Sequence, residues 1–189
     1  MTSRNAILLA ALALVVATLS LVLMLTVRGP KTAIGPGSPA TAPAGSAAAG
    51  RTIKARLFYV SDDGMRLTSV EHDVPFGEGV EQAREIINAQ LAPPAAPLVS
   101  AVPAGTTLRT LFITEQGDAY VDLSREAATA HPGGTLNELL TVYTIVSALT
   151  INLPAVRAVQ ILIDGREVQT LAGHVDLRQP LAANPGLVQ

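Results

Sequence analysis

The residues best suited to chemistry lie near the carboxyl end of the chain, where residues 173–177 read GHVDL. A histidine two positions from an aspartate can supply half of a metal site or half of a proton relay. In an extended chain, His174 and Asp176 share one face while Val175 points to the core. They can then bond each other or nearby backbone at the end of a sheet, or Asp176 can cap the following turn. We expect this structural role, with Gly173 permitting a bend.

No other residues complete a catalytic or metal-binding set. The other two histidines, His72 and His131, have neither H-x-H nor H-x-x-x-H spacing to any partner, and the chain has no cysteine and no G-x-S-x-G motif. Residues 131–134 (HPGG) lack the lysine of a phosphate-binding loop, so an entry to a helix is the favoured interpretation. We therefore predict no metal, no cofactor and no enzymatic activity. A cell-wall-directed envelope hydrolase that uses His174 and Asp176 is the alternative.

The hydrophobic pattern predicts the elements that position these residues. Strands are expected at 52–60 and 65–74, joined by the turn SDDG, and a helix at 78–92. A second hairpin (107–114 and 119–124), a helix (135–152) opened by a capping box of Thr135 and Glu138, and a strand (155–164) follow. A turn and a short closing strand that contains GHVDL complete the pattern. The order ββα–ββα–ββ predicts an α/β (α+β) fold, with one mixed sheet and two helices packed on one face.

The amino-terminal part differs from the rest. Residues 6–27 carry no charge, and their 22 residues would form a helix of roughly 33 Å, enough to cross a bilayer core. A cleaved signal peptide is the alternative, but its apolar core is usually only about 7–15 residues long. We predict a cytoplasmic amino terminus (1–5), a single-pass transmembrane anchor (6–27), a flexible Pro/Gly/Ala linker (28–50), a folded domain (51–181) outside the cytoplasm and a tail (182–189).

The predicted domain is acidic. Residues 51–189 hold ten of the basic residues and all fifteen acidic ones, a formal net charge of −5. Such a domain is a poor candidate for binding nucleic acid or an anionic lipid surface.

Four motifs together resemble the GerMN domain, named for the spore-germination protein GerM: SAVPAGTTL (100–108), VDLS (121–124), YTIVSAL (143–149) and GHVDL (173–177). Their order and spacing agree with that family over residues 52–181. The motif residues for which we expect structural roles are Gly105, Asp122, Gly134, Gly173, His174 and Asp176. The chain departs from the family in having one such domain rather than two, and in lacking the cysteine of a lipid anchor.

The resemblance implies a function as well as a fold. Members of the family are envelope domains outside the cytoplasmic membrane, and they are thought to assemble or support envelope complexes, including the trans-envelope apparatus of sporulating cells. Their fold is similar to the small ring-building modules of secretion systems, and no catalytic residues are known for them. We therefore expect a bacterial cell-membrane protein that acts as a non-enzymatic interaction or assembly module. Its expected partners are the cytoplasmic membrane through the anchor, an envelope protein or peptidoglycan, and possible further copies of itself.

Overall fold

The computed structural model describes residues 50–189, which lie in one compact unit. The predicted cytoplasmic segment (1–5), transmembrane anchor (6–27) and nearly all of the linker (28–50) fall outside the described residues. None of the helices within residues 50–189 has the length and hydropathy that crossing a membrane requires.

In chain order the elements are β1 (Thr52–Val60), β2 (Leu67–Pro75), α2 (Val80–Leu91), β3 (Leu108–Ile113), β4 (Asp118–Leu123), α3 (Glu126–Thr129), α4 (Thr135–Asn152), β5 (Ala158–Ile163), β6 (Arg166–Glu167), β7 (Leu181–Ala182) and a short 3-10 helix, Pro185–Leu187. Both predicted hairpins and both long helices are therefore confirmed. The four-residue helix α3 is an addition to the predicted pattern.

The strands form two separate sheets. β1 and β2 pair antiparallel along their whole length. The larger sheet has the order β3-β4-β5-β6, with β7 also pairing with β5. β4 and β5 are parallel, which requires a crossover, and α4 supplies it. The predicted mixed α/β class is confirmed, but the predicted single sheet is wrong.

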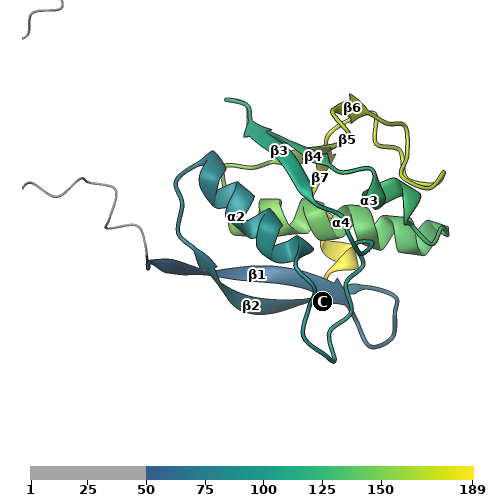
Figure 1. Cartoon of the computed structure of the whole chain (residues 1–189), viewed down its shortest axis with the longest axis horizontal. Coiled ribbons are helices and arrows are strands. Elements are labelled where there is room, and N and C mark those ends of the chain that lie inside the picture. Colours follow the sequence, from purple (N-terminus) through teal and green to yellow (C-terminus); the bar gives the residue numbers. More distant parts are fainter. Residues whose placement is uncertain (1–49) are drawn as a thin grey trace, which may run out of the picture. The chain divides into compact units, whose positions relative to one another are not determined.

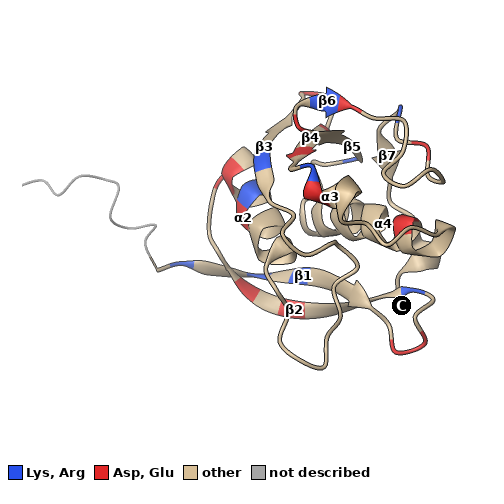
Figure 2. Ribbon diagram, turned by 45° about the vertical axis from the view of Figure 1, so that its right-hand side comes forward, with Lys and Arg blue, Asp and Glu red and all other residues tan. Residues whose placement is uncertain are grey.

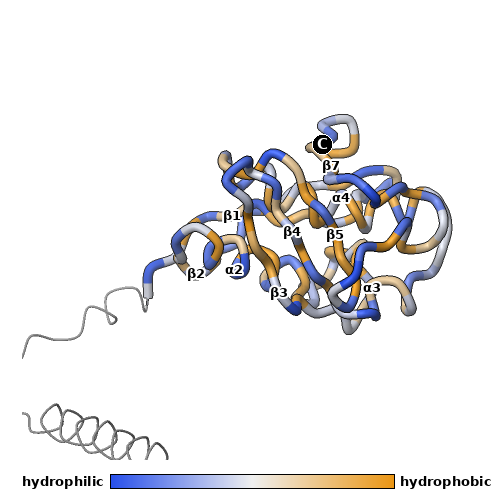
Figure 3. Tube along the Cα trace, turned by 90° about the horizontal axis from the view of Figure 1, so that it is seen from above, coloured by the Kyte–Doolittle hydropathy of each residue, from blue (hydrophilic) through white to orange (hydrophobic). Residues whose placement is uncertain are grey.

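The two long helices form a layer between the sheets (Figure 1). α2 and α4 contact each other, and each also contacts both the β1–β2 hairpin and the larger sheet. The apolar core therefore extends on both sides of the helix layer. β5, which is paired on both of its edges, carries a nearly continuous apolar run (Figure 3).

Two side-chain amides explain why the second hairpin does not join the first. The Gln90 side chain, which is fully buried, accepts the Phe58 N–H at 2.8 Å and donates to the Phe58 carbonyl at 2.8 Å. Asn152, the last residue of α4, makes the same pair of bonds with Arg56. These amides occupy the edge of β1 that another strand would need, because each strand edge offers one row of backbone donors and acceptors. They also fix both helices to β1.

Candidate functional site

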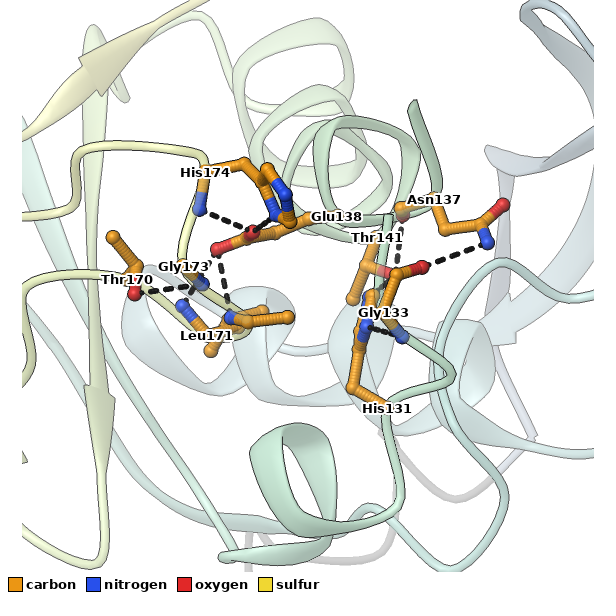
Figure 4. A network of polar contacts seen from close by, with 10 residues as sticks. His131, Gly133, Asn137, Glu138, Thr141, Thr170, Leu171, Gly173 and His174 are labelled. Atoms are coloured by element: carbon orange, nitrogen blue, oxygen red, sulfur yellow. Dashed lines mark hydrogen bonds and ion pairs between the residues drawn. The ribbon is translucent and has the colours of Figure 1, made fainter. Parts of the chain in front are cut away.

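The candidate site is built around Glu138, in the first turn of α4. Its side chain is fully buried, and its carboxylate lies against residues 168–180, which connect β6 to β7 and which we call the closing loop. One carboxylate oxygen accepts the backbone N–H groups of Leu171 (2.8 Å) and Ala172 (2.9 Å). The other accepts the N–H of His174 at 2.8 Å and lies 3.1 Å from Nδ1 of its ring (Figure 4). A single carboxylate thus accepts three backbone N–H groups of the closing loop and holds the loop around it.

The predicted capping box at Thr135 and Glu138 is wrong. The residue before the helix is Gly134, with a φ of +89°, and no side chain caps this helix end. The backbone N–H of Glu138 donates to the Gly134 carbonyl at 3.0 Å, while the Glu138 side chain turns to the closing loop. A carboxylate buried in an apolar layer needs several donors, and the closing loop provides more of them than a helix start can.

Burial of the Glu138 carboxyl opposes its charge, but the backbone N–H groups of the closing loop outweigh this effect. The pKa of Glu138 therefore lies below its ordinary value, and the group is a carboxylate at neutral pH. A general acid or base works best with a pKa near the working pH. The environment of Glu138 shifts its pKa in the opposite direction from that requirement.

The closing loop is not the strand that the sequence predicted. Residues 171–175 form successive bends, and Gly173 has a φ of +100°, which favours glycine. Thr170 Oγ1 accepts the Gly173 N–H at 2.9 Å and tightens the bend. The strand that closes the sheet is β7, later in the chain. The reason for the difference is Glu138, because its carboxylate binds neighbouring N–H groups that an extended strand would point in opposite directions.

His174 and Asp176 have different partners. The His174 side chain, 39% exposed, contacts Glu138, whereas both carboxylate oxygens of Asp176 bond the Arg178 guanidinium (2.9 and 2.6 Å). Asp176 also accepts the Arg178 backbone N–H at 3.0 Å, which is the turn-capping role considered above. The Arg178 side chain, and then its backbone N–H, lower the pKa of Asp176 to about 2. Both side chains nevertheless line one open hollow of about 240 Å³, with Gln169, Thr170 and Arg178.

Asp122, another predicted motif residue, fastens the larger sheet. Its side chain is nearly fully buried in β4 and accepts the Gly165 N–H from the turn between β5 and β6 at 2.7 Å. The Arg109 guanidinium approaches the same carboxylate at 3.4 Å and also pairs with Asp164. Gly105, the remaining motif residue, lies at an exposed turn before β3.

The remaining histidines have partners other than the Glu138 carboxylate. His72 Nε2 lies 3.2 Å from the Tyr59 hydroxyl. His131 accepts the Gly133 N–H at 2.9 Å and lies 3.1 Å from Thr141 Oγ1 (Figure 4). Within residues 50–189, no three histidine, aspartate or glutamate side chains gather in a way that could hold a metal ion.

Comparisons with known proteins show which structures share this fold. No match was found among curated proteins. A putative lipoprotein from Clostridium perfringens has a similar structure (TM-score 0.51, 22% identity), with 69% of this chain and 87% of that chain covered. The first GerMN domain of the sporulation protein GerM from Bacillus subtilis is also similar (TM-score 0.52, 18% identity; 69% and 98% covered).

The tandem GerMN domains of that Bacillus protein give a TM-score of 0.54 at 18% identity, with 70% of this chain covered. The alignment spans only 46% of the tandem structure. These likenesses establish a shared fold. The family described as "Germane: Sporulation and spore germination" matches residues 56–169, which is more than half of the chain. The chain therefore belongs to the Germane family and carries a GerMN-like domain.

Proposed function

We propose that this chain is a non-enzymatic interaction or assembly module of the bacterial cell envelope, held at the cytoplasmic membrane by residues 6–27. The observation that carries the proposal is that the Glu138 carboxylate bonds to His174 and to the backbone of the closing loop. Both oxygens of the Glu138 carboxylate accept backbone N–H groups, and its pKa is lowered. This acid–histidine contact thus stabilises the closing loop, and it does not have the free lone pairs and the matched pKa of a proton relay.

The location in the envelope draws on two further observations. Residues 6–27 form a charge-free run long enough to cross a bilayer. A protein of similar fold from Clostridium perfringens is described as a putative lipoprotein, and lipoproteins are attached to membranes. The family description adds sporulation and spore germination as the setting in which such domains act.

An envelope hydrolase is the second candidate, and one observation favours it. His174 and Asp176 line the same hollow, which is open to a substrate. Arg178 counts against it, because that guanidinium occupies both Asp176 oxygens. Incubation of the purified full-length chain with peptidoglycan sacculi tests this candidate. Release of soluble fragments by the wild-type chain but not by a folded His174→Ala variant would establish the hydrolase.

Crosslinking in intact cells tests the proposed module. The full-length chain is crosslinked, purified under denaturing conditions and analysed by mass spectrometry. The control carries residues 1–50 of this chain fused to an unrelated folded domain, so that the anchor and its location are unchanged. We expect at least one envelope protein to be enriched with the full chain over this control. Equal recovery of every protein from both would contradict the proposal.

A further inference from the structure

The outer edge of β2 presents backbone groups that no strand pairs. Arg56 and Phe58 of β1 direct their N–H and C=O groups away from β2, to Asn152 and Gln90. Because these directions alternate along an antiparallel pair, Ala55 and Leu57 face β2 and bond their register partners His72 and Val70. The backbone groups of the intervening residues in β2 therefore point outward. These residues are Ser69, Glu71 and Asp73.

The other long sheet edges in residues 50–189 carry contacts or an irregularity that the middle of β2 lacks. Gln90, Asn152 and the Val99 carbonyl close the outer edge of β1. On β3, Arg84 of α2 donates to the Leu111 carbonyl, and a register shift interrupts the strand between Leu108 and Thr110. The far edge of β5 pairs with β6 and β7.

Both ends of the β2 edge are also occupied. The Leu67 carbonyl accepts the Gln189 N–H at 3.0 Å, and the Pro75 carbonyl accepts from Gln82 at 3.1 Å. Between these ends, the outward groups of Ser69, Glu71 and Asp73 have no backbone partner among residues 50–189. The bridge between Val188 and Leu67 is parallel, and it confines the contact of the chain's own carboxyl end to the first residue of β2. An unprotected edge between protected ends is a feature that β-strand addition uses.

The charges on this edge decide which strand it fits. Glu71 and Asp73 are exposed on β2 and lie directly opposite Arg56 and Lys54 of β1. Acidic groups on one strand of the hairpin therefore face basic groups on the other (Figure 2). An added strand has its side chains directly opposite these carboxylates. A second copy that paired antiparallel about Glu71 would place Glu71 opposite Glu71. Pairing about His72 would place Glu71 opposite Asp73, and like charges directly opposite each other are destabilising.

We propose that β2 binds an extended peptide segment of another protein, with lysine or arginine at alternate positions, as a third antiparallel strand of the β1–β2 sheet. The segment bonds the outward N–H and C=O groups of Ser69, Glu71 and Asp73, and its basic side chains lie opposite the two carboxylates. This inference rests on the proposed function, because it names the partner chemistry of the same interaction module.

The probe is a capped peptide of about nine residues, roughly the length of β2, in which lysine alternates with valine. The full-length chain in detergent micelles is titrated with it, and backbone amide hydrogen exchange is followed. We expect the amides of Ser69, Glu71 and Asp73 to become protected. The amides of Val70 and His72, already bonded to β1, should change little. A peptide with the same composition but N-methylated at alternate residues lacks the N–H donors along one of its edges. It should not bind β2 through that edge.

Charge reversal provides the decisive comparison. In the double variant Glu71→Lys/Asp73→Lys, two attractive cross-strand pairs become repulsive, and we expect the lysine peptide to bind at least about tenfold more weakly. A peptide in which glutamate replaces lysine should gain affinity for this variant. The matched control, Glu115→Lys/Glu167→Lys, changes the net charge equally at exposed positions outside β2 and should bind as the wild type does.

Three results would overturn the inference. They are the absence of binding at millimolar peptide, binding that the double charge reversal leaves unchanged, and association of the chain with itself through the β2 edge. In-cell crosslinking separates this inference from the proposed function. If Glu71→Lys/Asp73→Lys captures the same envelope protein with the same yield as the wild type, the module stands but the β2 edge is not its binding surface.

Discussion

Replacement of Glu138 by glutamine tests whether one carboxylate holds the closing loop in place. The amide has nearly the same shape, and its oxygen can still accept the Leu171 and Ala172 N–H groups. Its NH2 group then faces the His174 N–H. Two donors therefore meet at the place where, in the wild type, a carboxylate oxygen accepts the His174 N–H. The remaining bonds also lose the assistance of a full charge.

The expected cost follows from these bonds. A hydrogen bond to a charged group contributes about 1.5–3 kcal/mol, and a buried donor without a partner costs about 1–3 kcal/mol. We expect Glu138→Gln to lower the free energy of unfolding by about 3 kcal/mol. A domain of roughly 140 residues unfolds with an entropy near 0.3 kcal/mol/K, so the melting temperature should fall by about 10 °C.

Thermal unfolding of the full-length chain, followed by circular dichroism, measures this change. Glu115→Gln is the matched control, because Glu115 is exposed in the turn between β3 and β4 and its replacement should cost less than about 0.5 kcal/mol. A melting temperature for Glu138→Gln within about 2 °C of the control would refute the anchoring role of the carboxylate.

Three further predictions concern the same framework. The folded pKa of Glu138 lies below its ordinary value of 4.5, so its charge stabilises the fold above that pH, and this contribution is lost on acidification. Urea unfolding should therefore show that the difference in free energy of unfolding between wild type and Glu138→Gln narrows as the pH falls below about 4.5. Gln90→Ala leaves the N–H and C=O of Phe58 buried without partners and should cost about 3 kcal/mol in urea unfolding, whereas the exposed Asn88→Ala should change the midpoint little. Gly173→Ala meets no atom within 4 Å but must adopt a φ of +100°, so calorimetry should show a loss of about 1–2 kcal/mol, and an unchanged melting temperature would contradict the need for glycine there.

The local elements could be predicted from the sequence because local chemistry determines them. The Asp63-Gly64 pair marks the turn of the first hairpin, and Gly64 indeed has a φ of +70°. The helix predicted at residues 135–152 has the same first and last residues as α4. These signals lie within a few positions of the structure that they specify.

The division into two sheets could not be predicted in this way. It depends on Gln90 and Asn152 reaching backbone groups of β1 that are 32 and 96 residues away in the chain. Glutamine and asparagine near the ends of helices are ordinary, and nothing local distinguishes these two. A periodicity argument counts apolar positions, and it gives no information on which polar side chains close the edge of a strand.

The candidate site was partly predicted. GHVDL was singled out and predicted to be structural, but Glu138 was assigned to a capping box because Thr135 precedes it by three residues. One signal could have identified its role: Glu138 precedes Val142, Ile145 and Leu149 by four, seven and eleven residues, so it shares their side of the helix, which enters the core. A carboxylate at such a position needs several donors, and a glycine-containing loop of successive N–H groups can supply them.

The measurement that tests the central claim most directly is the yield of the envelope partner crosslinked in intact cells by the wild-type chain and by a folded His174→Ala/Asp176→Asn variant. The account holds that this domain works by binding and that these two residues support its structure. It predicts that both chains capture the same partner with equal yield, above the control that carries residues 1–50 alone on another domain. No enrichment with the wild-type chain, or loss of the partner by a variant that remains folded, would contradict it.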